Sequence, residues 1–225
     1  TNYAQYAIII TTEPEGKEIM VDGEVYTTPH SFQWFKNSEH QISIPSPQSQ
    51  TLDSRFVFDY WSNEEDRSHT YTVTTPDTLT GYLTKQYSLN VNSKRGNPQG
   101  TNWYDENTSA DYSVTTPVIN GDTKYLFQNW TGDIYETEPS GSIIMDSPKT
   151  INANWSVQHF LNVISPHGNP QGEAWYNKGI TAHFSLTSPE VNDSIKYIFQ
   201  QWLGDYTGTS TSGSINMDTS KTVTA

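Results

Sequence analysis

Short stretches that alternate apolar and polar residues recur along the chain, bounded by glycine, proline, asparagine or aspartate. A period of two is typical of a half-buried strand, and β-branched and aromatic residues favour it. In the first part of the chain the expected strands cover residues 7–12, 19–21, 24–26, 31–34, 40–44, 55–61, 69–74 and 79–84. No segment keeps a 3.6-residue apolar period over three turns, so the pattern predicts an all-β fold.

One nine-residue motif occurs twice. Residues 96–104 are Gly-Asn-Pro-Gln-Gly-Thr-Asn-Trp-Tyr, and residues 168–176 are Gly-Asn-Pro-Gln-Gly-Glu-Ala-Trp-Tyr. The offset of 72 residues is kept beyond the motif: 87–153 align with 159–225 without a gap, and about half of the pairs are identical. Self-similarity at a fixed period indicates repeated structural units.

Three modules are expected, and they are residues 1–85, 86–157 and 158–225. Linkers of a few residues, at 84–87 and 156–159, would hold them in a semi-rigid row. The second module continues past Ala153 to Trp155, whereas the third stops at the equivalent Ala225. We therefore expect the third module to be truncated in its last strand and the chain to belong to a longer protein.

A module of about 70 residues is near the lower limit for an independent core, so packing between neighbouring modules is expected. Aromatic residues make up 13% of the chain and supply much of the apolar area. Short strands with Pro and Gly turns predict small, immunoglobulin-like β-sandwiches, with β-grasp-like repeats as the alternative. The expected core aromatic residues are Trp34, Trp61, Trp103, Phe127, Trp130, Trp155, Trp175, Phe199 and Trp202.

The formal net charge is −13, which argues against nucleic acid or an anionic membrane as a partner. The chain has no cysteine, so no disulfide framework is available. It contains no run of 18 apolar residues, so no direct membrane insertion is expected from this segment.

The first module resembles the PEGA module of bacterial and archaeal surface proteins. The matching segments are residues 13–16, 21–23, 26–29, 32–34, 46–48 and 58–61. The second and third modules are similar to the divergent internalin-type B-repeat, through the nine-residue motif and residues 125–133, 145–146 and 149–150. The resemblance implies tandem modules of a large protein of the cell surface or cell wall, with no shared catalytic residue.

Acidic residues recur around one loop of each repeat, and they suggest a calcium site. The candidate ligands are Asp133, Asp146, Asp205 and Asp218. Calcium takes six to eight oxygen ligands, so these carboxylates would form only part of its shell. The alternative is that each aspartate caps a turn through its own backbone.

The tryptophans of the nine-residue motif, Trp103 and Trp175, have three interpretations. Core packing is favoured, and packing against the neighbouring module or an exposed platform for sugar stacking are the others. Lys149 and Lys221 occupy equivalent positions at the start of a strand. They are interpreted as charged edge residues, with an isopeptide cross-link as the alternative.

Four Asn-x-Ser/Thr sequons are candidate glycosylation sites. Asn107 and Asn192 lie in turn-like stretches and are the favoured acceptors. Asn129 and Asn154 are expected to point outward from strands beside tryptophans.

The six histidines form no metal-spaced pair, and no nucleophile or phosphate-binding motif occurs, so we expect no enzyme. The favoured hypothesis is an extracellular stalk, spacer or assembly segment whose partners are neighbouring modules. One alternative is an adhesin that binds glycan or protein through loops 131–142 and 203–214. Another is a subunit of a surface filament or S-layer.

Overall fold

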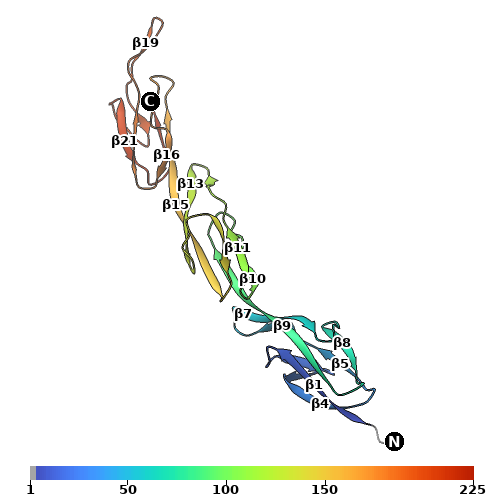
Figure 1. The fold of residues 1–225 in the computed structure, drawn as a ribbon. Helices are drawn as coiled ribbons and strands as arrows, with labels where there is room; N and C mark the ends of the chain where they lie inside the picture. Colours follow the sequence, from blue (N-terminus) through green and yellow to red (C-terminus); the bar gives the residue numbers. More distant parts are fainter. Residues whose placement is uncertain (1–3) are drawn as a thin grey trace. The chain divides into compact units, whose positions relative to one another are not determined.

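The computed structural model describes residues 4–225 and contains strands but no helix in that range (Figure 1). The predicted all-β class is confirmed, and the sheets are open. A β-grasp fold carries a helix across its sheet, so the β-grasp alternative is not supported by residues 4–225. Residues 1–3 of the predicted first module lie outside the described residues.

Twenty-two strands follow one another along the described chain. The first nine are β1 (Gln5–Glu13), β2 (Glu18–Val21), β3 (Glu24–Thr27), β4 (His30–Phe35), β5 (Glu39–Ser43), β6 (Gln48–Ser49), β7 (Ser54–Trp61), β8 (Ser68–Thr72) and β9 (Asp77–Asn92). The next six are β10 (Asn102–Asp105), β11 (Ser109–Ser113), β12 (Val118–Asn120), β13 (Thr123–Gly132), β14 (Ser140–Ile144) and β15 (Lys149–Ile164). The last seven are β16 (Ala174–Asn177), β17 (Thr181–Ser185), β18 (Glu190–Asn192), β19 (Ile195–Tyr197), β20 (Leu203–Gly204), β21 (Ser212–Asn216) and β22 (Lys221–Thr224).

The chain forms two compact units, each discontinuous in sequence. One comprises the chain up to Asn90 with Gly100–Ala110 and Ser142–Lys149. The other comprises Val91–Gln99, Asp111–Gly141 and Thr150–Ala225. The division into three sequence modules stays a prediction, and "first", "second" and "third module" below denote those sequence ranges.

The first module is a sandwich of two sheets. In one sheet β1 pairs with β4 on one side and with β9 on the other, and β9 continues the sheet to β7 and β6. The other sheet has the order β3-β2-β5-β8. Ile8, Leu79 and Phe56 of the first sheet share one core with Ile19 and Ile42 of the second. The hairpin of β2 and β3 turns at Asp22-Gly23, both at positive φ, as that dipeptide predicts.

The third module repeats this plan with fewer strands. β15 pairs with β16 and β22, and β20 pairs with β22. Across the core lies the pair of β17 and β21. Leu161 and Val223 of the first sheet and Phe184 of the second belong to one buried cluster.

A tryptophan is fully buried at the same place in every repeat. Trp61, Trp130 and Trp202 are each 0% exposed. The indole N–H of each donates to a backbone carbonyl in the loop that follows, at Arg67, Glu138 and Ser210 respectively. Burial of the ring and pairing of its one polar atom explain why these positions carry tryptophan.

The other predicted core aromatic residues differ in burial. Trp34 is 9% exposed and stacks on Phe32 and His40. Phe127 and Phe199 are half-buried and tilt against Trp130 and Trp202. The remaining three, Trp155, Trp103 and Trp175, are also half-buried.

The predicted linkers at 84–87 and 156–159 are wrong. Residues 84–87 lie inside β9 and residues 156–159 lie inside β15, and each strand is 16 residues long (Figure 1). The first strand of a module and its last strand pair in parallel, as in β1 with β9 and β15 with β22. The outgoing strand therefore runs in the same direction as the incoming one.

We predict that Trp202→Ala lowers the free energy of unfolding of the third module by about 3–5 kcal/mol, because it removes a fully buried ring. Urea denaturation followed by NMR of third-module amides measures the loss. Val191→Ala in the same module is the control, since Val191 is 64% exposed, and it should cost less than about 1 kcal/mol. Equal losses in the two variants would contradict the assignment of Trp202 to the core.

Candidate functional site

The most specific feature of the described chain is the junction at which a strand passes from one module to the next. At the first junction Gln86 and Tyr87 of β9 pair with β7 on one side and with β10 on the other. At the second junction Gln158 and His159 of β15 pair with β13 and β16 in the same way. Each junction residue thus has one partner strand from the preceding module and one from the following module.

The backbone contacts of the two junctions are the same. Ser88 N–H donates to the Asp53 carbonyl at 3.1 Å, and the equivalent Phe160 N–H donates to the Asp122 carbonyl at 3.0 Å. Glu106 N–H donates to the Lys85 carbonyl at 2.8 Å. The equivalent bond, from Lys178 N–H to the Val157 carbonyl, is also 2.8 Å long. The two junctions thus share the same backbone hydrogen bonds although their side chains differ. The pairing of the strands, rather than particular side chains, therefore defines the junction.

A cation of the preceding module lies over the motif tryptophan at both junctions. The Arg55 guanidinium is 4.4 Å from the centroid of the Trp103 ring, and the Lys124 ammonium is 4.5 Å from that of Trp175. Arg55 and Lys124 are each the second residue of their strand, directly after the residue that pairs with Tyr87 or His159. Such contacts contribute about 0.5–1 kcal/mol at exposed sites.

Trp103 and Trp175 are therefore not core residues, contrary to the favoured interpretation of the sequence. Both are half-buried, and each contacts residues of the preceding module. Trp175 also tilts against Phe160 at a centroid distance of 5.2 Å. Their position corresponds to the second interpretation, packing against the neighbouring module.

The rest of the nine-residue motif builds the turn that presents this tryptophan. Tyr104 O–H donates to the Gly100 carbonyl at 2.9 Å, and Tyr176 repeats the bond to Gly172 at 2.9 Å. Gly100 has a φ of 108°, a region open to glycine and strained for other residues. The tyrosine thus closes the turn, and the tryptophan one residue earlier on the strand faces the junction.

Charged groups add a second layer to the first junction. The Lys85 ammonium lies 3.3 Å from a Glu106 carboxylate oxygen, and Tyr87 O–H donates to the same oxygen at 2.9 Å. The Tyr87 and Glu106 oxygens raise the pKa of Lys85 above its usual value. Arg55 Nε donates to Gln86 Oε1 at 2.8 Å, and the Gln86 amide donates to Asp105 at 2.8 Å.

The candidate calcium ligands are bound to protein donors. Asp133 Oδ2 accepts from Thr150 N–H at 2.6 Å, and Asp205 Oδ2 accepts from Thr222 N–H at 2.7 Å. Asp146 and Asp218 pair with lysines three residues later, as described below. Residues 4–225 contain no group of three or more His, Cys, Asp or Glu side chains arranged to hold a metal ion. Asp133 and Asp205 thus each bind a backbone N–H 17 residues later in the chain rather than one in their own turn, and the calcium site stays a prediction.

Lys149 and Lys221 each pair with an aspartate in the turn before their strand. The ammonium–carboxylate distance is 2.6 Å to Asp146 and 2.9 Å to Asp218. Hydrogen bonding to the lysine lowers the pKa of both carboxyl groups. Both aspartates are mostly exposed, so these are surface ion pairs at the start of a strand.

The sequons differ in accessibility. Asn107 is exposed in the turn after β10, and Asn192 is exposed at the end of β18, in a hairpin rather than a free turn. Asn154 is exposed, and its amide donates to Thr131. Asn129 is half-buried, and its amide donates to the Trp130 carbonyl. Glycosylation of all four stays a prediction.

The described residues include no helix that is long and apolar enough to cross a membrane. Comparisons with protein families, with curated proteins and with solved structures find nothing that matches this chain. The resemblance to surface-protein modules therefore stays a prediction.

The sequence analysis missed the junction although the chain carries a signal for it. From Ile151 to Gln158 apolar residues alternate with polar ones, and this alternation continues into the predicted linker. His159, at the centre of that linker, is only 8% exposed. Alternation that continues into the predicted linker indicates a strand there rather than a loop.

We predict that the cation and the tryptophan of each junction are energetically coupled. A double-mutant cycle with Lys124→Ala and Trp175→Ala should give a coupling of about 0.5–1 kcal/mol in the free energy of unfolding. The control cycle combines Lys196→Ala with Trp175→Ala, because Lys196 is an exposed lysine of the third module, to which Trp175 also belongs. This control cycle should give no coupling. Additive effects of Lys124→Ala and Trp175→Ala would contradict the contact.

We predict that Lys221→Met raises the pKa of Asp218 toward its unperturbed value of about 3.9. The Lys221 ammonium stabilises the ionised Asp218 carboxylate, so the ion pair stabilises the fold above the unperturbed pKa of this carboxyl group. This stabilisation is lost as the pH falls through the lower pKa of Asp218 in the folded state. An NMR titration of the Asp218 carboxyl carbon measures the shift. Lys178→Met serves as the control, and an unchanged Asp218 midpoint in Lys221→Met would refute the pairing.

Proposed function

We propose that this chain is a non-catalytic spacer segment of a large extracellular protein, in which the modules are joined end to end without flexible linkers. The observation that carries the proposal is β15, whose junction residues Gln158 and His159 are paired on both sides. A strand of 16 residues extends over about 50 Å at the usual rise per residue. A flexible chain of the same length has a root-mean-square extension of only about 20–25 Å.

The arrangement of strands within a module supports this role. Parallel pairing of the first and last strands brings the chain out at the end of the module opposite to the end at which it enters. Repetition of such modules extends the chain in one direction. Pairing on both sides resists bending at the junction, because bending breaks hydrogen bonds on one side of the strand.

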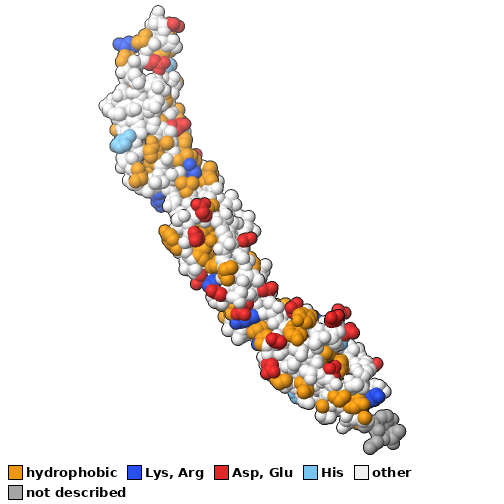
Figure 2. All heavy atoms as spheres, in the orientation of Figure 1, with side chains coloured by type: hydrophobic (Ala, Val, Ile, Leu, Met, Phe, Trp, Pro, Cys, Tyr) orange, Lys and Arg blue, Asp and Glu red, His pale blue; other side chains and the backbone are white. Residues whose placement is uncertain are grey.

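The surface charge is consistent with a segment that is exposed and keeps neighbouring molecules apart. The chain has 25 acidic residues and 12 Lys and Arg residues. Figure 2 shows Asp and Glu side chains spread over the visible face, with fewer Lys and Arg side chains among them. A net negative charge favours solubility and opposes self-association. Extracellular, cell-surface location is part of the proposal and rests on the resemblance to surface modules.

The proposal predicts a narrow distribution of distances across the second junction. Because the chain has no cysteine, Glu138→Cys and Ser220→Cys introduce a unique pair of exposed spin-label sites in the second and third modules. Pulsed dipolar EPR should give one narrow distance peak. Insertion of Gly-Gly-Ser between Gln158 and His159 should broaden that peak severalfold, because it interrupts the shared strand.

The same insertion between Asp193 and Ser194, at the turn between β18 and β19, is the control and should leave the peak narrow. A broad distance distribution in the chain without the insertion would contradict the spacer proposal. Equal widths in the parent and in the junction insertion would show that the shared strand does not set the stiffness.

A further inference from the structure

The strand that enters the first module, β1, lies inside a sheet and not at its edge. Residues 5–10 of β1 pair with β4, and residues 8–13 pair with β9, the strand that leaves the module. Ile8 and Ile10 are fully buried, and they share one core with Leu79 of β9. To be drawn out of the module, β1 has to break its bonds to both neighbouring strands.

Tension along the chain acts on β1 and β9 in opposite directions. The two strands are parallel, so tension pulls the start of β1 toward the entry of the module and the end of β9 toward its exit. The strands would then have to slide past each other along their length. Because the hydrogen bonds of a sheet run between the strands, sliding loads all of them together, whereas peeling loads them one after another. The third module has the same arrangement, since β15 and β22 are parallel.

A hydroxyl residue stands at the end of the strand that enters each module. Its side chain donates to the backbone carbonyl two residues later. The donors are Thr12, Ser93 and Ser165, and the acceptors are the carbonyls of Pro14, Arg95 and His167, at 2.9, 2.6 and 2.6 Å respectively. The bond closes the turn that follows the strand, so the strand and its turn are held together.

A backbone hydrogen bond ties this turn to the body of each module. In the first module the Gly16 N–H donates to the Thr28 carbonyl at 3.0 Å. In the other two modules the glycine of the turn is the acceptor, and the bonds run from Thr115 N–H to Gly96 and from Thr187 N–H to Gly168, both at 2.6 Å. The end of the entering strand is therefore anchored in all three modules.

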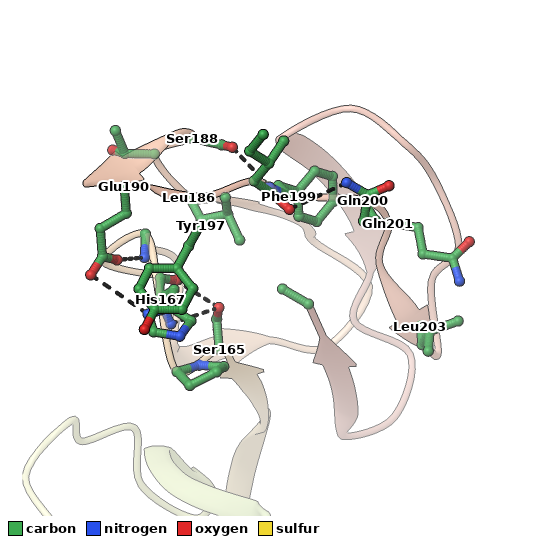
Figure 3. Close-up of a pocket in the computed structure, with 15 residues that line it drawn as sticks. Ser165, His167, Leu186, Ser188, Glu190, Tyr197, Phe199, Gln200, Gln201 and Leu203 are labelled. Atoms are coloured by element: carbon green, nitrogen blue, oxygen red, sulfur yellow. Dashed lines mark hydrogen bonds and ion pairs between the residues drawn. The ribbon is translucent and has the colours of Figure 1, made fainter. Parts of the chain in front are cut away.

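Figure 3 shows this turn in the third module. Ser165 lies beside His167, whose ring stacks on the Tyr197 ring at a centroid distance of 3.5 Å. Glu190 of β18 binds the same turn, because its carboxylate accepts from the Gly168 N–H and lies 3.6 Å from His167 Nδ1. Side chains thus add to the backbone bond that holds the turn.

In the first module the anchor contains a buried pair of hydroxyl groups. Thr12 and Thr28 are both buried, and their hydroxyl groups are hydrogen-bonded to each other. Thr28 Oγ1 also accepts from the Lys17 N–H at 3.1 Å. Movement of β1 toward its own start withdraws Thr12 from this pair and leaves buried hydroxyl groups without partners, which is unfavourable. The anchor therefore opposes the displacement that tension produces.

We propose that these modules bear tension along the chain. The parallel pair of entering and leaving strands is loaded in shear, and the hydroxyl anchor holds the entering strand against withdrawal. Resistance to tension depends on contacts inside one module, whereas stiffness depends on the junction between two. The inference therefore goes beyond the spacer role and holds whether or not the chain is a spacer.

Force spectroscopy on single molecules of the full chain tests this inference with two directions of pulling. The chain has no cysteine, so two introduced cysteines define the points of attachment. Gln5→Cys with Lys94→Cys, both at exposed positions, pulls β1 against β9 in shear. Gln5→Cys with Lys36→Cys pulls at the end where Gln5 pairs with Phe35, so it peels β4 from β1. At equal loading rate we expect a severalfold higher unfolding force in shear than in peeling, because forced unfolding follows the unfolding rate along the direction of pulling.

The Thr12→Val variant tests the anchor. Valine is also β-branched and lacks the hydroxyl group, so this variant should unfold at a lower force in shear. Its force in peeling should stay unchanged, because peeling begins at Gln5, at the opposite end of β1 from Thr12. The control is Thr78→Val, at an exposed position of β9, and it should change neither force.

Equal unfolding forces in the two directions would overturn the proposal. An unchanged shear force in Thr12→Val would contradict the anchor. So would an equal loss of force in both directions, because the hydroxyl group would then contribute to stability in general rather than hold the strand against tension. The distance measurement across the second junction tests the spacer proposal separately from these outcomes.

Discussion

A strand that belongs to two modules at once is the constraint from which the rest of the structure follows. The last strand of a module pairs in parallel with the first, so it must leave in the direction in which the chain entered. At Gln86 and Tyr87, and again at Gln158 and His159, this strand is paired with the preceding module on one side and with the following module on the other. A backbone paired on both sides has no free torsion at the boundary, and the boundary is therefore part of a sheet.

The side chains at the junctions follow from this constraint. Residues 84–86 of β9 and 155–158 of β15 are all half-buried, so no sharp alternation of buried and exposed positions marks the boundary. Lys85 is half-buried there, and His159 is buried. Amphipathic side chains suit these positions, because a long or aromatic stem covers apolar surface while the polar end finds a partner. A cation over the motif tryptophan completes the cover at both junctions.

The sequence predicted what depends on local pattern. The fold class, the Asp22-Gly23 hairpin and burial of Trp61, Trp130 and Trp202 follow from alternation, turn residues and the repeat. The linkers at 84–87 and 156–159 were predicted because these residues lie at the boundaries between the modules. The boundary residues instead belong to β9 and β15, each of which pairs with strands of both modules.

Tertiary contacts decided the remaining differences. Trp103 and Trp175 carry large apolar rings, and composition alone assigns such rings to a core. Their actual environment depends on Arg55 and Lys124, which lie 48 and 51 residues earlier in the chain, and local pattern carries no information on that pairing.

Amide hydrogen exchange along β15 tests the shared strand most directly. The amides from Val157 to Phe160 should exchange as slowly as those of Ile151 and Val163, which lie in the strand on either side of the boundary. The Phe160 N–H, which donates to the Asp122 carbonyl across the junction, is the most informative single probe. Exchange of these four amides at the rate of an exposed loop, with Ile151 and Val163 still protected, would show that the modules are joined by a linker.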